Sequence, residues 1–425
     1  MREMKDSGIE WIGEIPINWQ AVNPRWLFAQ RKDRAKKGME QYTASQKYGV
    51  ISQKDYMNRI GGSIVTVQKD FDILKMVCKG DFVIHMRSFQ GGLEYSEHTG
   101  SISSAYVMLI PQKNAGECRY FKWLFKSASY INALQSTSNL IRDGQAMRYS
   151  NFIQIIIPYP PLVEQQQIAD YLDTKCSEID ATAEDIQKEI ALLEEYKKSL
   201  VYNVISNGIN HSIYSTENDE VWGNLPQGWK LVDIKYLFEI VKRIAGKEGY
   251  DVLSVTQKGL KIKDITSGDG QLADNYCGYQ FVYPTDYVMN HMDLLTGWVD
   301  CSELFGVTSP DYRVFRLIDR SAHNLVYYKY VMQCCYMNKI FYSLGQGVSN
   351  LGRWRLQTSS FNNFQVPVPP KDEQDEIADY LDTKCSEIDT LIADKKRQLD
   401  ILADYKKSLI YEYVTGKKEV PVKDF

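Results

Sequence analysis

The sequence lacks the patterns that mark several common protein classes. Its eight cysteines include no Cys-x-x-Cys pair, which argues against a zinc ribbon and against a disulfide framework. We therefore expect a reducing compartment, the cytoplasm. No run of eighteen apolar residues occurs and no signal-peptide core follows the first residues, so we expect neither a membrane span nor a membrane partner.

The motifs of common catalysts are missing as well. There is no Gly-x4-Gly-Lys-Ser/Thr loop for ATP hydrolysis and no Asn/Asp-Pro-Pro-Tyr/Phe tetrapeptide of an adenine methyltransferase. The five histidines have no metal-ligand spacing, and no Ser/His/Asp or Cys/His set assembles. We therefore expect no catalytic residue, no metal and no cofactor in this chain.

One segment of the sequence occurs twice without a change. The thirteen residues Ile168–Asp180 are identical to Ile377–Asp389. A match of this length indicates a duplicated chain, and Glu10–Trp19 parallels Glu220–Trp229 near the start of each half. A period of about 210 residues is too long for a solenoid, so we expect two domains, each followed by a helix.

The middle of each half has short apolar runs bounded by Gly, Ser, Asn and Pro, as strands are. Such runs are Phe82–Ile84, Tyr106–Ile110 and Ile153–Ile157, while Tyr120–Leu134 and Tyr327–Tyr342 have the pattern of amphipathic helices. Each half therefore predicts a mixed α+β globule of about 150 residues. We expect the domains at 1–157 and 210–366, the first long helix at 158–209, and the second long helix with a tail at 367–425.

Each predicted long helix follows a Pro-Pro pair and carries apolar residues at alternating steps of three and four, which is a heptad seam. About forty residues at 1.5 Å each would give a rod of roughly 60 Å. One helix cannot bury its own seam, so we expect the two to pair antiparallel within the chain and to dock partner helices. A plain coiled-coil spacer is the alternative. The seam residues that we assign to partner docking are Ile168, Leu172, Ile179, Ile186, Leu193, Ile377, Leu381, Ile388, Leu399 and Leu409.

The net charge of −4 hides an uneven distribution. Residues 1–157 hold 21 Lys and Arg against 14 Asp and Glu, whereas residues 158–209 hold 4 against 10. Residues 210–366 are nearly neutral, with 15 against 16. The first domain can therefore attract a polyanion, while the acidic helices are better suited to a protein partner.

Basic residues recur at equivalent places in the two halves. The run Arg31–Lys37 follows Phe28, and Lys242 and Arg243 follow Phe238 in the same way. These side chains are suited to neutralise phosphates, although a solvated surface segment is the alternative. Later loops carry Arg and Gln, which bind guanine and adenine edges through paired hydrogen bonds. His291 is either a further contact or a packing histidine. The candidate DNA contacts are Arg31, Lys32, Arg34, Lys36, Lys37, Lys54, Arg87, Arg142, Gln145, Arg148, Lys242, Arg243, Lys247, Lys258, His291, Gln346, Arg353 and Arg355.

Two short motifs resemble those of a known family. Ser7–Pro16 with Trp19 is similar to the N-terminal signature of specificity subunits of type I restriction–modification systems. Ile157–Ile168 resembles that family's Pro-Pro-Leu-x-Glu-Gln junction into a conserved helix. The second copy, Val366–Ile377, keeps the Pro-Pro and Glu-Gln pairs but has Lys371 where the first has leucine.

The resemblance implies two target recognition domains, each reading one half of a bipartite DNA sequence, related by an internal pseudo-two-fold axis. It implies antiparallel coiled-coil helices that set the spacing and dock two methyltransferase subunits, which carry S-adenosylmethionine and modify adenine. Restriction subunits with motor and nuclease activity would complete the complex. The divergence of the two domains predicts an asymmetric target, and the near-neutral second domain predicts dependence on partner subunits.

Two other functions are open from the residues alone. A structural coiled-coil adaptor without sequence-specific DNA recognition would explain the helices, but it would not explain two diverged domains with Arg- and Gln-bearing loops. A methyltransferase or nuclease with a cryptic site would need motifs that the sequence lacks.

Overall fold

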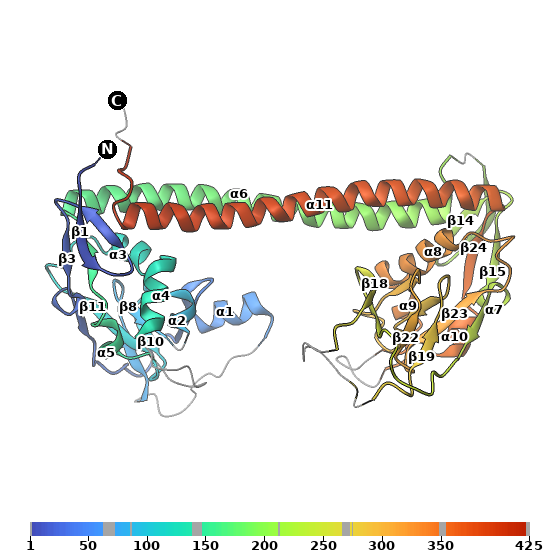
Figure 1. The fold of residues 1–425 in the computed structure, drawn as a ribbon, viewed down its shortest axis with the longest axis horizontal. Helices are drawn as coiled ribbons and strands as arrows, with labels where there is room; N and C mark the ends of the chain where they lie inside the picture. The colour runs from blue at the N-terminus through green and yellow to red at the C-terminus, as the bar shows by residue number, and fades with distance from the viewer. Residues whose placement is uncertain are drawn as a thin grey trace. The chain divides into compact units, whose positions relative to one another are not determined.

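A computed structural model describes residues 2–62, 73–85, 87–137, 147–210, 213–265, 273, 275–347 and 354–421. The chain divides into two compact units. The first unit comprises Met1–Ile186 and Arg397–Phe425, and the second comprises Gln187–Lys396. Two long helices, α6 (Leu162–Asn207) and α11 (Lys371–Val414), each contribute one part to each unit (Figure 1).

The globular part of the first unit is mixed α and β. Its elements are β1 (Met4–Ile9), β2 (Gly13–Pro16), β3 (Gln20–Val22), η1 (Pro24–Trp26), β4 (Phe28–Gln30), β5 (Tyr42–Ser45), β6 (Gly49–Ser52), α1 (Gln53–Ile60), β7 (Lys75–Val77), β8 (Phe82–Ile84), α2 (Ser88–Gly91), β9 (Glu94–Tyr95), β10 (Gly100–Ile102), β11 (Val107–Pro111), α3 (Cys118–Leu124), α4 (Ala128–Ser136), α5 (Tyr149–Phe152) and β12 (Ile157–Tyr159).

The second unit repeats most of this order. Its globular elements are β13 (Tyr214–Asp219), β14 (Gly223–Pro226), β15 (Lys230–Asp233), α7 (Ile234–Leu237), β16 (Phe238–Val241), β17 (Leu253–Thr256), β18 (Gly259–Ile262), β19 (Gln280–Val282), β20 (Tyr287–Met289), β21 (Val299–Cys301), β22 (Gly306–Thr308), β23 (Arg313–Leu317), α8 (Leu325–Met337), α9 (Ile340–Ser343), α10 (Thr358–Asn362) and β24 (Gln365–Val368).

The sheet topology shows that the whole domain is duplicated. A four-stranded antiparallel sheet has the order β4-β11-β8-β9 in the first unit and β16-β23-β20-β21 in the second. Two-stranded pairs also correspond, β12-β3 with β15-β24 and the hairpin β5-β6 with β17-β18. The helix α1, which follows the first hairpin, has no counterpart among the described residues of the second unit. The predicted α+β duplication is therefore confirmed, and the two copies differ beside this hairpin.

Aromatic side chains form the core between the sheet and the helices of each unit. The buried Phe28 ring lies 5.2–5.7 Å from four other phenylalanine rings, those of Phe82, Phe121, Phe125 and Phe152. Phe238 has the same place in the second unit, with three aromatic rings at 5.3–5.5 Å. Edge-to-face packing of this kind fixes ring orientations as well as burying apolar area.

Three predicted elements differ from the structure. The predicted helix Tyr327–Tyr342 is divided into α8 and α9 at Lys339, whose φ of 56° is left-handed. The apolar run Ile153–Ile157 is a turn, and the strand β12 begins only at its last residue. The backbone oxygen of Ile153 accepts a hydrogen bond from Asn23, so side-chain donors replace a strand partner there. The predicted helix Tyr120–Leu134 is divided into α3 and α4, because the Ser127 hydroxyl accepts from the Tyr130 N–H and starts a new helix.

The long helices pair antiparallel within each unit, as the seam predicts. In the first unit, Ile168 and Leu172 of α6 share one core with Leu409 and Val414 of α11. In the second unit, the end of α6 and the start of α11 meet in the same way. Ion pairs repeat across the seam, Lys406–Asp180 at 2.6 Å and Lys197–Asp389 at 2.7 Å. The repeated residues therefore serve the same contact in both copies.

A buried glutamine joins each domain to its helix. Gln165 is fully buried; its Oε1 accepts from the Glu117 N–H at 2.9 Å and its Nε2 donates to the Pro160 oxygen at 2.8 Å. Gln374 makes the same pair of bonds, from the Asn324 N–H and to Pro369, both at 2.9 Å. The Glu-Gln motif after the Pro-Pro pair is therefore a joint that fixes how each domain sits on the repeated helix.

Tryptophan and tyrosine side chains complete this joint in both units. Trp19 Nε1 donates to Glu164 at 2.8 Å, and Trp229 Nε1 donates to Glu373 at 3.0 Å. The helix that follows the sheet is tied down as well. Trp123 Nε1 donates to Asp173 at 2.9 Å in the first unit, and the Tyr330 hydroxyl donates to the equivalent carboxylate of Asp382 at 2.7 Å in the second. The equivalent aspartates Asp173 and Asp382 therefore accept hydrogen bonds from two different kinds of side chain, an indole and a phenol.

We expect the substitution Leu381→Ala to destabilise the second unit by about 2–5 kcal/mol, because Leu381 is fully buried and the cavity would refill poorly. Urea unfolding followed by circular dichroism measures this change. Leu391→Ala on the same helix is the matched control, because Leu391 is 51% exposed and should change the unfolding free energy by less than about 0.5 kcal/mol. Equal effects of the two substitutions would contradict the assigned seam.

Candidate nucleic-acid interface

Two of the predicted phosphate contacts, Arg31 and Arg243, form ion pairs with aspartates of their own domains. Arg31 donates to both carboxylate oxygens of Asp81, at 2.7 and 2.9 Å, and the Asp81 side chain is only 2% exposed. This pair raises the pKa of Arg31. Arg243 holds the equally buried Asp286 at 2.7 Å in the second unit. Each of these partly buried guanidinium groups is bound to a buried carboxylate of its own domain, so we assign them to the fold and not to phosphate binding.

The rest of the first basic run is exposed. Lys32, Lys36 and Lys37 have exposed side chains, which leaves them accessible to a polyanion. Arg34 is also exposed, but its guanidinium donates to the Ile73 backbone oxygen at 2.9 Å. The run therefore divides into residues that hold the loop and lysines that face solvent.

A second basic cluster lies on the hairpin β5-β6 and on α1. The Tyr48 ring has Lys47 Nζ at 5.2 Å and the Arg59 guanidinium at 5.0 Å from its centroid. The Tyr56 ring lies 6.2 Å from Tyr48. Lys54, one of the predicted contacts, is exposed on the same short helix. Cations interleaved with aromatic rings are typical of nucleic-acid-binding surfaces.

The corresponding hairpin of the second unit is basic too, but its chemistry differs. Lys258, a predicted contact, and Lys261 are exposed on β17-β18, and no helix follows this hairpin among the described residues. Lys242 is exposed, and Lys247 lies over the Tyr250 ring at 5.6 Å. The two domains therefore present different cations at equivalent places.

Three predicted residues of the second unit come together. Backbone hydrogen bonds in both directions pair Gln346 with Arg355, and the Leu356 N–H donates to the His291 oxygen at 3.0 Å. Gln346 and Arg355 are exposed, whereas His291 is buried. The buried Arg313 lies under this segment and donates to the Leu356 oxygen at 3.1 Å. Burial and the charges of both arginines lower the pKa of His291 to about 4, so it is neutral at pH 7.

The other predicted contacts are scattered. Arg87 and Arg148 are exposed next to α2 and α5, where their backbones help to begin these short helices. Arg142, Gln145 and Arg353 lie outside the described residues.

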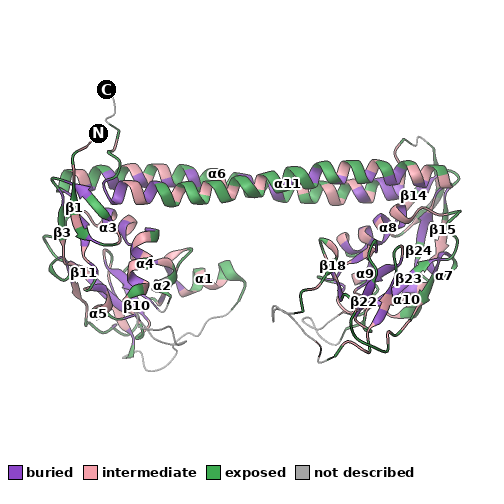
Figure 2. Cartoon of the chain, viewed as in Figure 1, coloured by how far each residue is buried: buried purple, intermediate pink, exposed green. Residues whose placement is uncertain are grey.

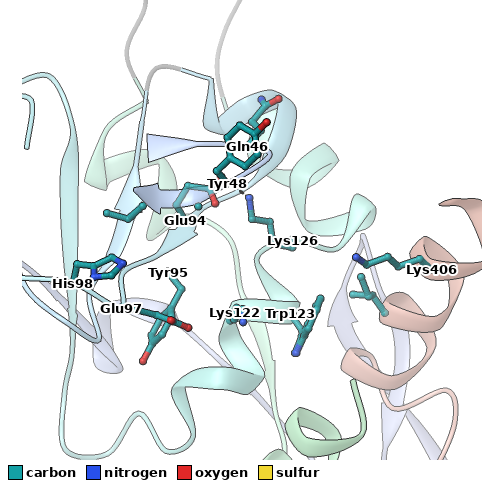
Figure 3. A pocket seen from close by; sticks show the side chains of 13 residues that line it. Gln46, Tyr48, Glu94, Tyr95, Glu97, His98, Lys122, Trp123, Lys126 and Lys406 are labelled. Atoms are coloured by element: carbon teal, nitrogen blue, oxygen red, sulfur yellow. Dashed lines mark hydrogen bonds and ion pairs between the residues drawn. The ribbon is translucent and has the colours of Figure 1, made fainter. Parts of the chain in front are cut away.

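Each unit has a cleft of about 490 Å³ between its globular part and the long helices. Figure 3 shows the first cleft, with Lys126 directed at Glu94 and with Lys406 of α11 across from them. Lys406 is paired with Asp180, and Lys197 in the second cleft is paired with Asp389. These three lysines already have carboxylate partners, so they are less suited to bind a phosphate than the exposed Lys258, which also lines the second cleft.

The seam residues that we assigned to partner docking pack against other residues of the same chain. Eight of the ten are buried, and Leu193 and Leu399 are half-buried. A partner can therefore meet only the outward faces of α6 and α11, which carry the exposed residues in Figure 2.

None of the described helices is long and apolar enough to span a membrane, and no cluster of three or more potential metal ligands occurs among the described residues.

Comparison with known proteins identifies the family of this chain. The family model of the type I restriction–modification DNA specificity domain matches residues 16–192 and again residues 226–400. The chain belongs to this family. It is a specificity subunit with two tandem recognition domains, and family membership implies DNA and the other subunits of a restriction–modification complex as partners. Specificity subunits are generally not the catalytic subunits of such complexes.

Relatives of this specificity subunit match along nearly its whole length. The MjaVIII type I restriction enzyme specificity subunit of Methanocaldococcus jannaschii is 26% identical, over 96% of this chain and 94% of the relative. A protein of the same organism described as the MjaX specificity subunit is 22% identical, over 96% of both chains.

Solved structures share the fold of the specificity subunit. A chain from a structural study of complex assembly and conformational transition in a type I restriction–modification system aligns with a TM-score of 0.64 at 13% identity, over 95% of this chain and 99% of that chain. The HsdS subunit of Thermoanaerobacter tengcongensis aligns with a TM-score of 0.50 at 14% identity, over 95% and 98%.

Sequence reasoning missed three cations of this specificity subunit. Lys47 and Arg59 flank Tyr48, and a search for basic residues interleaved with tyrosines would have found them. Arg313 stands among apolar residues in the run Tyr312–Phe315, and a charge at an inward position of a strand is itself a signal.

We expect the specificity subunit to lose stability as the pH falls from about 6.5 to about 4, in part because the unfolded chain protonates His291 and the folded chain does not. Titration of the histidine ring protons by NMR measures the pKa directly. Arg355→Gln should raise the pKa of His291 by removing one nearby cation, whereas Arg316→Gln, at an exposed site on the same strand as Arg313, should not. A His291 pKa of 6.5 or higher would contradict the described burial.

Proposed function

We propose that each recognition domain reads one half of an asymmetric bipartite DNA sequence, and that α6 and α11 set the distance between the halves. The observation that carries this proposal is a contrast within the duplication. The joint from each domain to its helix repeats atom for atom, from Gln165 to Gln374. The exposed cations beside the hairpins differ, with Arg59 and Lys54 on one and Lys258 and Lys261 on the other. The two domains are attached to their helices in the same way but expose different cations, as expected if each binds a different half-site.

We also propose the composition of the complex. Two methyltransferase subunits that carry S-adenosylmethionine would dock on the helices in the cytoplasm and methylate adenine in each half-site. Restriction subunits would join to cleave unmodified DNA. The net negative charge of the repeated helix segment 158–209, with 4 cations against 10 acids, supports a protein partner there because it disfavours DNA.

The exposed faces of the helices supply a docking surface in place of the buried seam. Leu192 and Tyr196 are 69% and 57% exposed on α6, and Ile401 and Tyr405 are 59% and 53% exposed on α11. The two pairs are equivalent in the duplication, one in each unit. Apolar pairs at a spacing of four residues lie on one helix face, where a partner helix can cover them. Two equivalent surfaces support two copies of the same partner.

We expect selection from random duplexes, with methyltransferase subunits added, to recover a split sequence. Replacing residues 20–157 by the same region of another family member should change one half of this sequence and leave the other intact. Sequencing of the bound duplexes measures both. An exchange of the second domain, residues 230–366, is the reciprocal control. The absence of any enriched sequence would sink the proposed function, and changes in both halves would sink the assignment of one domain to one half-site.

We expect the double substitution of Leu192 and Tyr196 by Asp to remove one methyltransferase subunit from the complex, and that of Ile401 and Tyr405 to remove the other. Losing two desolvated apolar anchors costs roughly 2 kcal/mol or more each in protein interfaces. Native mass spectrometry counts the bound subunits. Val163→Asp, at a site 66% exposed near the start of α6, is the control and should retain both subunits. Retention of two subunits by each double variant would place docking elsewhere.

A further inference from the structure

The second recognition domain contains a buried cation that has no acidic partner. Arg313 begins β23 and is 4% exposed. Its Nη2 donates to the Leu356 oxygen at 3.1 Å and to the Thr358 hydroxyl at 3.3 Å, and its guanidinium lies 4.5 Å from the centroid of the Phe361 ring. Among the described residues no carboxylate forms an ion pair with it, and its Nη1 is buried without a hydrogen-bond partner.

The first domain has no such cation at the equivalent place. In the first unit Val107 lies opposite Ile84 on the sheet, as Arg313 lies opposite Met289 in the second. An apolar residue therefore suffices for this fold, so packing does not explain the arginine. Burying a charge without a counter-ion is strongly unfavourable and lowers the pKa of Arg313 to about 10. A buried cation perturbed in this way marks a candidate functional site.

A second cation, Arg355, precedes the residue whose oxygen Arg313 binds, Leu356. Arg355 is exposed, and its charge lowers the pKa of both Arg313 and His291. Its backbone is held on both sides, since Gln346 pairs with it and the Leu294 N–H donates to the neighbouring Trp354 oxygen at 3.2 Å. Arg355 is therefore a solvent-facing cation on a fixed segment.

Further polar atoms of this cluster lack partners. His291 Nδ1 and Trp354 Nε1 are buried without a hydrogen-bond partner among the described residues. The nearby Asp293 is engaged elsewhere, by the backbone N–H groups of Leu295 and Thr296. Two arginines and a neutral histidine thus form a positive node, because two cations outnumber the one nearby carboxylate, that of Asp293.

We propose that this node is a phosphate-binding site of the second recognition domain, in which Arg355 contacts a DNA phosphate oxygen and Arg313 acts as a positioning residue beneath it. Arg313 holds the segment through Leu356 and Thr358, and its field strengthens the attraction at Arg355. The proposal rests on the proposed function, and it names a backbone contact and not a base contact. Arg313 is buried, so it cannot reach a base edge.

Replacing Arg313 by methionine separates a binding role from a structural one. Methionine fills a similar volume without charge. Removing the uncompensated buried cation should outweigh the loss of its two hydrogen bonds and so stabilise the second unit. The same variant should bind the duplex selected by the wild-type complex about tenfold more weakly. A stability gain together with an affinity loss is the expected result. A stability loss would assign Arg313 to the fold alone and overturn the proposal.

Arg355→Gln tests the contact itself. It should weaken binding of the selected duplex and of its single-base variants by the same factor, and should lower the slope of log affinity against log salt by about 0.9. Arg316→Gln is the matched control and should change neither, because Arg316 is exposed on the same strand as Arg313 and is paired with Glu239 of the neighbouring strand β16. A loss confined to one base position would show base recognition and overturn the phosphate assignment.

Inorganic phosphate provides a readout that is independent of DNA recognition. Thermal unfolding of the free chain in rising phosphate, at constant ionic strength, should show stabilisation that Arg355→Gln removes and Arg316→Gln keeps. If phosphate stabilises the wild type in this way but no duplex is enriched, the anion site stands and the proposed DNA function fails. If a split sequence is enriched but Arg355→Gln changes neither readout, the function stands and this site fails.

Discussion

The buried amide of Gln165, with its counterpart Gln374, is the interaction on which each half of the molecule depends. An amide has one acceptor and one donor end, and here both ends are used by backbone groups of the domain junction. Leaving either end unpaired in a buried place costs about 1–3 kcal/mol. Polar geometry therefore fixes how the domain meets the helix, which apolar area alone would leave adjustable.

This joint explains why the repeat is identical while the domains diverge. Within the thirteen repeated residues, Ile168 and Leu172 fill the seam, Asp173 accepts from the domain, and Asp180 holds a lysine of the opposing helix. Nearly every turn of the segment thus has a partner on a different element. The hairpins and α1 have no such ties to the helix, so their exposed residues are free to change without loosening the joint.

The sequence predicted the parts of this fold that follow from periodicity and duplication. The helices, their antiparallel pairing and the strand Phe82–Ile84 were recovered because apolar spacing reports directly on burial. The prediction of a strand at Ile153–Ile157 was wrong, because this run is hydrogen-bonded by residues about 130 positions away, such as Asn23. Periodicity cannot report contacts that only the fold creates.

The same limit applies to the interface. The basic run predicted both Arg31 and Lys32 as phosphate contacts. A buried aspartate 50 residues away binds Arg31, whereas Lys32 stays exposed and unpaired by it. Arg313 was not predicted as a contact for the opposite reason, because it is a single basic residue in an apolar run. Charge in a sequence reports surface potential only where the fold supplies no acidic partner.

The two domains consequently attract a polyanion in different ways. The first has an excess of seven cations, 21 against 14, many of them on exposed loops. Fields from such surface charges are screened over about 8–10 Å at ordinary salt. The second domain has 15 cations against 16 acids, and its distinctive charge is buried under Arg355, where screening by solvent is weaker. A near-neutral domain can therefore still bind a backbone phosphate, provided that its attraction is concentrated at one place, and binding by the first domain should be the more sensitive of the two to salt.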